Sequence, residues 1–219
     1  MKEPTEPRTL MELASLPDVN AASRFTRMCR TLATDRLVAA YYRLVNNSPQ
    51  RHSVDKRYFV GHTGRPSTGE WTNRIEEHLA IALWNDARSW ELPTGGVLEL
   101  LDYQVPLKAR QSDRGIGKID LFAVSDSNRP AVIELKVKGK SRSDTPLRAL
   151  LEAMTYAAIV EVNADAFRAE VRELAGKRLT TARPDLLIAA PSAYWTMWKK
   201  RKAAAGWRRA FGSLCESLS

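Results

Sequence analysis

The stretch GKIDLFAVSDSNRPAVIELKVK, residues 117–138, decides the expected fold. Polar and apolar residues alternate over Ile116–Val124 and again over Ala131–Val137, with the two-residue period of β-strands. The residues between them, Ser125–Pro130, are of the kinds that dominate turns. We therefore expect these two segments to form an antiparallel β-hairpin.

Polar residues of this hairpin fall on one face. A three-residue turn at 126–128 places Asp120 opposite Glu134, with Cβ atoms about 5 Å apart, and Lys136 points the same way. Two carboxylates at that distance either share a proton or bind a divalent cation. We expect Asp120 and Glu134 to hold Mg²⁺, for which Mn²⁺ can substitute, with the Leu135 carbonyl as a third oxygen ligand. No His or Cys lies within sequence reach, which favours these hard cations.

This grouping suits hydrolysis of a phosphodiester bond. A metal ion polarises the phosphate and lowers the pKa of a bound water, while Lys136 stabilises the charge of the transition state. We therefore expect Lys136→Ala to abolish cleavage without harm to folding. The alternative is that Asp120, Glu134 and Lys136 form the solvated face of an ordinary strand. Helices expected on both sides of the sheet would bury that face, which makes a charged cluster costly unless it has a function.

Helices and further strands are expected on both sides of the hairpin. Before it lie a helix that ends near Trp84 and a strand over Val97–Leu107. The apolar stripe of that helix consists of Ile75, Leu79, Ala82 and Leu83. After the hairpin, Thr145-Pro146 caps a helix that runs to about Val162, and the apolar run Leu186–Ala190 is typical of a strand covered on both faces. This order predicts an α/β fold with a central sheet flanked by helices.

The chain divides into two expected parts. Residues 1–66 form a helical N-terminal extension, in which residues 1–19 are a loosely docked lead-in and a helix over Asn20–Val45 breaks near Thr34. Residues 67–219 form the main domain. That domain ends in a basic, tryptophan-rich helix from Tyr194 to about Phe211, and its tryptophans are expected to anchor the core.

The hairpin and its neighbours resemble the PD-(D/E)XK nuclease superfamily, which has the restriction-endonuclease-like fold. The residues GKIDLFAV and AVIELKVK match the family's Asp followed, after a short hairpin, by Glu-x-Lys, and the resemblance spans roughly residues 70–190. The residue before Asp120 is Ile119 rather than proline. The resemblance implies a central mixed sheet and Mg²⁺-dependent cleavage of DNA that uses Asp120, Glu134 and Lys136.

The resemblance also implies roles for residues on the flanking helices. Many family members carry a metal-facing acid on the helix before the first core strand, which here is Glu76 or Glu77. We prefer Glu76 as a catalytic residue because it shares a stripe with Leu79, and the alternative is a solvated acid. Some exonuclease-like members carry Gln-x-x-x-Tyr on the helix after the lysine strand. Glu152 and Tyr156 have that spacing and are accessory candidates, although we favour helix surface and packing for both.

The net charge of +9 is concentrated in two segments. Residues 105–148 carry 10 basic and 5 acidic side chains, and residues 194–219 carry 6 and 1. Local positive charge attracts polyanions, and DNA is the expected one, with RNA as an alternative. The other interpretation is a basic surface that only keeps the protein soluble. The candidate nucleic-acid-binding residues are Lys108, Arg110, Arg114, Lys118, Lys138, Lys140, Arg142, Lys199, Lys200, Arg201 and Lys202.

Composition disfavours several other classes of protein. The 219 residues are 44% hydrophobic and 27% charged, which are globular values. The longest apolar runs fall far below the roughly 18 residues of a membrane span, and the N-terminus lacks the apolar core of a signal peptide. The two cysteines, Cys29 and Cys215, indicate neither a disulfide framework nor a zinc site. We expect a cytoplasmic nuclease, with a homodimer left open, or alternatively a non-catalytic nucleic-acid-binding or regulatory protein on the same fold.

Overall fold

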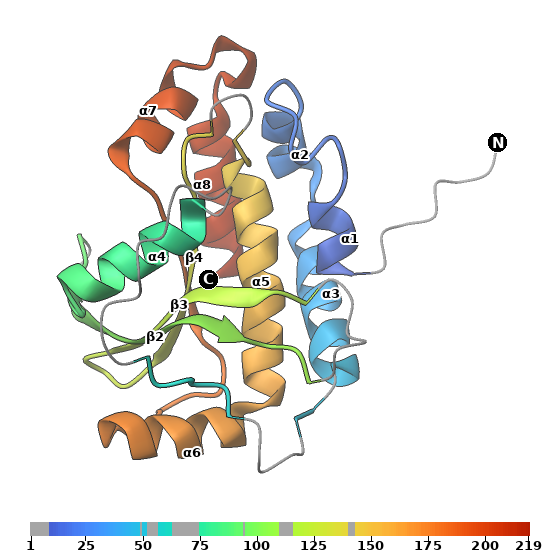
Figure 1. The fold of residues 1–219 in the computed structure, drawn as a ribbon. Coiled ribbons are helices and arrows are strands. Elements are labelled where there is room, and N and C mark those ends of the chain that lie inside the picture. Colours follow the sequence, from blue (N-terminus) through green and yellow to red (C-terminus); the bar gives the residue numbers. More distant parts are fainter. Residues whose placement is uncertain are drawn as a thin grey trace.

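The structure is a computed structural model that describes residues 9–48, 50–51, 57–62, 75–93, 95–109, 116–139 and 143–219 (Figure 1). Its helices are α1 (Leu10–Ala14), α2 (Phe25–Thr31), α3 (Thr34–Asn47), α4 (Ile75–Asp86), α5 (Pro146–Val162), α6 (Ala164–Ala175), α7 (Ser192–Lys200) and α8 (Trp207–Leu218). Its strands are β1 (Ser89–Glu91), β2 (Val97–Pro106), β3 (Lys118–Ser125), β4 (Pro130–Leu135) and β5 (Asp185–Ala189). Within the described ranges, no helix is long and apolar enough to cross a lipid bilayer.

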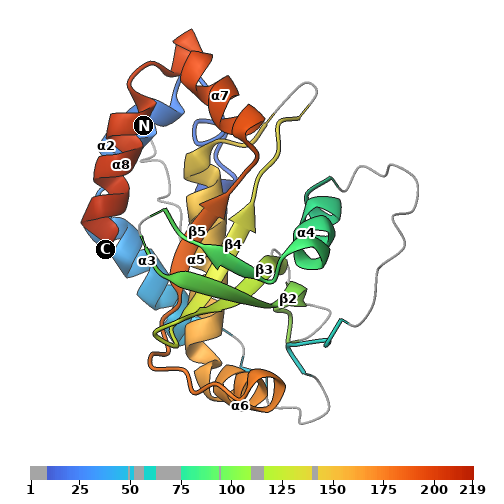
Figure 2. The same cartoon turned by 90° about the vertical axis from the view of Figure 1, so that its left-hand side faces the viewer.

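The five strands form one mixed sheet in the order β1-β2-β3-β4-β5. Neighbouring strands are antiparallel except β4 and β5, which run parallel and are connected through α5 and α6. Figure 2 shows α4 on one side of the sheet and α5 on the other, with α3 and α8 beyond α5. The expected α/β class, with a mixed central sheet flanked by helices, is confirmed.

The β3–β4 hairpin has the register expected from the sequence. Leu121 pairs with Ile133, and residues 126–128 make a three-residue turn between the strands. The amide of Ser125 donates to the carbonyl of Arg129 at 2.9 Å and so closes that turn. The odd-numbered turn keeps the polar positions of the two strands in step, and the predicted register is therefore confirmed.

Helices bury both faces of this hairpin. On one face, Ala80 and Trp84 of α4 pack with Leu121. On the other face, Phe122 packs with α5 and α6, and its ring centroid lies 5.4 Å from that of Phe167. Strand residues that are buried from both sides are typical of a sheet between two helical layers.

The buried face of α4 differs from the expected apolar stripe. Ala80 and Trp84 are buried, whereas Ile75 is 42% exposed, and Ala82 is also exposed. The predicted stripe is confirmed in part, since Leu79 and Leu83 pack against the core under α4. Ile75 and Ala82 do not, because the side turned to the sheet follows a spacing of four residues through Ala80 and Trp84. Glu76 lies on that same row, one turn before Ala80.

The N-terminal helices share a hydrophobic core with the end of the chain. Side chains of α1, α2 and α3 form one buried cluster with those of α5, α7 and α8. Phe25 of α2 contacts two tryptophans of the last helices, with ring centroids 5.1 Å from Trp198 and 6.0 Å from Trp207. The boundary expected between residues 66 and 67 lies outside the described residues and stays a prediction.

Residues 9–19 are packed rather than loosely docked, so that expectation is wrong. Leu10 is completely buried, and α1 begins with a reciprocal capping box between Thr9 and Glu12. The Val19 carbonyl accepts a hydrogen bond from the Thr145 hydroxyl at 2.7 Å, which ties the segment to the start of α5. The expected break near Thr34 is confirmed, since α3 begins there.

The single terminal helix expected over Tyr194–Phe211 is also wrong. The structure has two helices, α7 and α8, separated by a 3₁₀ turn at Lys202–Ala204 and by Gly206. Gly206 has a φ of +78°, a left-handed conformation that glycine adopts at little cost. The Trp207 indole donates to the Trp198 carbonyl at 3.0 Å. The reversal therefore brings both tryptophans into the same core.

Candidate active site

Asp120 and Glu134 lie at one end of the β3–β4 hairpin. The observed register, continued by one residue, sets them opposite each other. The Asp120 carboxylate accepts the Leu135 amide on Oδ2 at 2.8 Å and the Gln104 side-chain amide on Oδ1 at 3.0 Å. Burial raises the pKa of Asp120, although the Leu135 amide, the Lys136 charge and Gln104 oppose the rise. These donors fix the orientation of the carboxylate.

Lys136 is the centre of a buried charge cluster. Its Nζ lies 2.7 Å from Glu134 Oε1, 3.0 Å from Glu152 Oε2 and 3.8 Å from Glu76 Oε1. Its side chain is only 4% exposed, and its amide extends the β4–β5 ladder by donating to the Ala189 carbonyl at 2.9 Å. Burial alone would lower the pKa of Lys136, but the three carboxylates outweigh it and raise that pKa. Lys136 therefore stays protonated.

The two buried glutamates around Lys136 have different electrostatics. Burial raises the pKa of Glu134 well above its usual value, and the charges of Asp120 and Glu152 add to the rise against Lys136. Burial also acts to raise the pKa of Glu152, but Lys136 and Arg148 lower it further than burial raises it. The Arg148 Nε lies 2.9 Å from Glu152 Oε1. Glu152 is thus the better stabilised anion, and Glu134 is the carboxylate more ready to take a proton or a cation.

Glu152 is not a helix-surface residue, so the favoured surface interpretation is wrong for it. Glu152 is buried because α5 is covered on almost all sides. Its carboxylate contacts Lys136. The hydroxyl of Tyr156, one turn further along α5, comes so close to Gly117 that a Cβ there would lie 2.7 Å from it. Burial raises the pKa of Tyr156, with further contributions from Glu134 and Glu152. Both accessory candidates therefore line the cluster.

The first turn of α4 offers two acids, and Glu76 is the one that reaches Lys136. Its side chain is partly exposed, and burial raises its pKa while Lys136 opposes the rise. Glu77 lies near Tyr103 instead. Burial raises the pKa of Tyr103, and the charges of Asp102 and Glu77 add to the rise. The geometry thus separates the two candidates in the order preferred from the sequence.

Sequence reasoning missed two residues that position the cluster. Gln104 holds Asp120 from β2, and its φ of +49° follows a register irregularity between Leu100 and Asp102. A bulge of this kind has no signal in the residue pattern. Arg148 clamps Glu152 from one turn away, and their spacing of four residues is a signal that could have indicated the pair.

The carboxylates have the oxygen chemistry that Mg²⁺ and Mn²⁺ prefer. Glu134 Oε2 is buried without a hydrogen-bond partner among the described residues, so it can still accept a donor or a cation. Leu135, whose carbonyl is the expected third ligand, contributes its amide to Asp120. In the described part of the chain, no three or more His, Cys, Asp or Glu side chains are grouped so that they could hold a metal ion. Asp120 and Glu134 supply the type of oxygen ligand that such a cation needs. In the structure, Glu134 is paired with Lys136.

The candidate nucleic-acid-binding residues are mostly on the surface. Lys108, Lys118 and Lys138 are exposed and lie near the strand ends that carry the cluster. Lys199, Lys200 and Lys202, at the end of α7 and just after it, are also exposed. Arg201 differs, because it is half-buried with its guanidinium 4.9 Å from the ring centre of Trp198. Arg110, Arg114, Lys140 and Arg142 lie outside the described residues.

The cluster thus joins side chains from α4, β3, β4 and α5 at one end of the sheet. It offers carboxylate oxygens for a cation, a permanently protonated amine for an anion, and a tyrosine hydroxyl at its edge. This combination can bind and polarise a phosphate group. No family model, curated protein or solved structure matches the chain.

Proposed function

We propose that the chain is a metal-dependent nuclease that hydrolyses phosphodiester bonds of DNA at the cluster of Asp120, Glu134 and Lys136. The observation that carries the proposal is the hairpin register, which sets Asp120 opposite Glu134. The Nζ of Lys136 lies 2.7 Å from Oε1 of Glu134. The resemblance to the PD-(D/E)XK superfamily supports the same reading, and we infer a restriction-endonuclease-like fold from it. The surface lysines near these strand ends support a polyanionic substrate.

Asp120 and Glu134 are the residues that would hold the cation. When bound, Mg²⁺ supplies polarisation of the scissile phosphate and a water of lowered pKa. Gln104 and the Leu135 amide keep Asp120 in one orientation. The unpartnered Oε2 of Glu134 supports its role as a ligand.

Lys136 is the residue that meets negative charge on the phosphate. The carboxylates around its Nζ keep it protonated and hold the ammonium in place before substrate arrives, which lowers the cost of reorganisation. As charge grows on the phosphate oxygens, the ammonium can donate one of its three hydrogens to them. Glu152, already stabilised by Arg148, can remain its partner throughout.

The alternative is a non-catalytic nucleic-acid-binding or regulatory protein. One observation favours it: Lys136 already has three carboxylate partners within 4 Å. A cluster that satisfies its own charges can serve only to stabilise the fold, in which case the basic surface would bind nucleic acid without turnover. Cys29 and Cys215 are both free, which suits the reducing cytoplasm under either proposal.

Cleavage of nucleic acid tests the proposal. The purified chain is incubated with circular duplex DNA, linear duplex DNA, single-stranded DNA and RNA, with Mg²⁺, with Mn²⁺ or with EDTA. We expect cleavage of DNA that needs a divalent cation and is lost in Asp120→Asn. Retarded migration of the nucleic acid without cleavage under every metal condition would favour the non-catalytic alternative, and cleavage that survives in EDTA would contradict the metal-dependent mechanism.

A further inference from the structure

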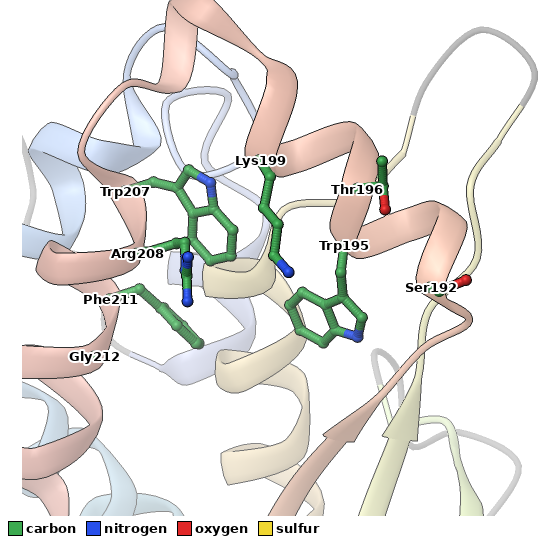
Figure 3. A pocket seen from close by; sticks show the side chains of 8 residues that line it. All are labelled: Ser192, Trp195, Thr196, Lys199, Trp207, Arg208, Phe211 and Gly212. Atoms are coloured by element: carbon green, nitrogen blue, oxygen red, sulfur yellow. The ribbon is translucent and has the colours of Figure 1, made fainter.

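A surface hollow of about 430 Å³ lies between α7 and α8, outside the acidic cluster. Figure 3 shows the side chains of Trp195 and Lys199 on α7 and of Trp207, Arg208 and Phe211 on α8 turned towards it. We call it the α7–α8 hollow. Aromatic and cationic side chains dominate its lining, and none of the described residues that line it carries a carboxylate.

Two aromatic side chains of the hollow, Trp195 and Trp207, are already arranged with parallel rings. The indole planes of Trp195 and Trp207 are nearly parallel, at 13°, with centroids 6.3 Å apart. Trp207 is buried, held by its hydrogen bond to the Trp198 carbonyl. Trp195 is only half-buried, so its indole offers surface to a ligand. Binding of a planar apolar ligand here would therefore cost the protein little conformational entropy.

The charges of the hollow indicate an anion joined to that planar group. Lys199 and Arg208 are exposed at its rim, and residues 194–219 carry six basic side chains against one acidic one. A nucleotide matches both features, because it joins a planar aromatic base to a negatively charged phosphate a few ångströms away. Stacking on an aromatic side chain beside a basic groove is the usual way in which proteins bind single-stranded nucleic acid.

The hollow is joined to the acidic cluster through the end of the sheet. Helix α7 begins three residues after Ala189, which pairs with Leu135 beside Glu134. The Tyr194 hydroxyl donates to the Asp144 carbonyl at 2.8 Å. The Asp144 carboxylate lies 3.3 Å from Arg148, which contacts Glu152 of the cluster. The contacts therefore connect α7 to the cluster through β5 and through the start of α5.

We propose that the α7–α8 hollow binds a nucleobase of single-stranded DNA, stacked on Trp195, with the adjoining phosphate on Lys199 or Arg208. The inference rests on the proposed function for its substrate class and narrows that class to an unpaired strand beside the cleavage site. Bases inside a duplex are stacked on one another and cannot reach an indole without being extruded.

Binding without cleavage tests this site separately from the nuclease. Fluorescence anisotropy in EDTA compares a labelled thymidine strand of about eight nucleotides, within the size that single-strand sites cover, with a duplex of the same length. Trp195→Ala should weaken binding of the single strand by about 5- to 150-fold, the effect of losing one stacked base. Trp195→Phe should restore part of it, and duplex binding should change little.

Tyr42→Ala is the matched control, because Tyr42 is also an exposed aromatic beside an arginine, with the Arg183 guanidinium 5.3 Å from its ring, but it lines a different cavity. It should bind the single strand as the unaltered chain does. Lys199 is exposed, so Lys199→Ala should not affect folding. It should reduce the slope of log affinity against log salt concentration by about 0.7, the value for one phosphate contact on a single strand.

The site is refuted if Trp195→Ala and Tyr42→Ala bind the single strand equally well, or if the unaltered chain does not bind it. Equal losses for single strand and duplex would also overturn the assignment to unpaired bases. Metal-dependent cleavage with no single-strand binding would contradict this inference alone. Single-strand binding that depends on Trp195, with no cleavage in any metal, would support the inference and contradict the nuclease.

Discussion

Replacing Lys136 with methionine should destabilise the fold strongly. Methionine nearly matches the length of lysine and packs well in buried sites, so the change removes mainly the charge. Glu134, Glu152 and Glu76 would then lose a cation that lies within 4 Å of all three. A buried charge that loses its only close partner is costly, and the effect falls first on Glu134, which has no other cation within salt-bridge distance among the described residues.

The magnitude follows from the burial of the pair. The side chains of Lys136 and Glu134 are 4% and 6% exposed, so they form a buried ion pair, and breaking such a pair costs about 3–5 kcal/mol. That is a large part of the roughly 5–15 kcal/mol by which domains are stable. Lys138→Met, two residues along at an exposed position, should change the free energy of unfolding by less than about 0.5 kcal/mol.

Urea unfolding followed by far-UV circular dichroism measures both variants. The loss in Lys136→Met should shrink as the pH falls from about 7.5 towards 5, because burial already raises the pKa of Glu134 and loss of Lys136 raises it further. A group whose pKa is raised in the folded state stabilises that state only when protonated, so acid relieves the penalty. Adding Glu134→Gln should recover part of the loss. A Lys136→Met variant as stable as Lys138→Met would refute the buried-cluster account.

Three further outcomes are expected elsewhere in the chain. Phe25→Ala should cost about 3–5 kcal/mol in the same urea assay, because the N-terminal helices share the tryptophan core; a loss below about 1 kcal/mol would mean that they are dispensable. Gly206→Ala should cost about 1–2 kcal/mol through its left-handed backbone, and an unchanged unfolding midpoint would contradict the conformation described between α7 and α8. Burial raises the pKa of Cys29 to about 12, so this thiol should react slowly with a disulfide reagent near pH 8 and rapidly in urea, and more slowly than the partly buried Cys215; fast reaction of Cys29 in the folded protein would contradict its burial.

Local patterns predicted the hairpin and the start of α5. The alternation of Asp120 and Glu134 with apolar neighbours, together with a turn of fixed length, is enough to set the register, since one residue of slippage would reverse every side chain. The cap at Thr145 needs only its own hydroxyl, which accepts the Arg148 amide at 3.1 Å. Features determined within a few residues are visible in the sequence.

Features that depend on distant partners were not predictable. Glu152 looks like a surface acid until Lys136 is brought to it from β4, and Gln104 reaches Asp120 only through an irregularity in β2. Helix propensity does not reveal the reversal at Gly206, because Trp198 and Trp207 meet in a core shared with α2. The same dependence bears on Lys136: the sequence alone predicts a catalytic group that can be removed without harm to folding, whereas the structure gives it three carboxylate partners, of which Glu134 and Glu152 are buried.

Single-turnover cleavage of DNA by Glu134→Gln in Mg²⁺ tests the central claim most directly. Glutamine keeps the shape of the side chain and can still accept from Lys136 at the position now 2.7 Å away, so a folded variant isolates the loss of the carboxylate charge. The account predicts that the unaltered chain cleaves and that the variant is slower by roughly two orders of magnitude or more, with circular dichroism unchanged. Equal rates for the two proteins would contradict the claim that Glu134 and its cluster form the active site.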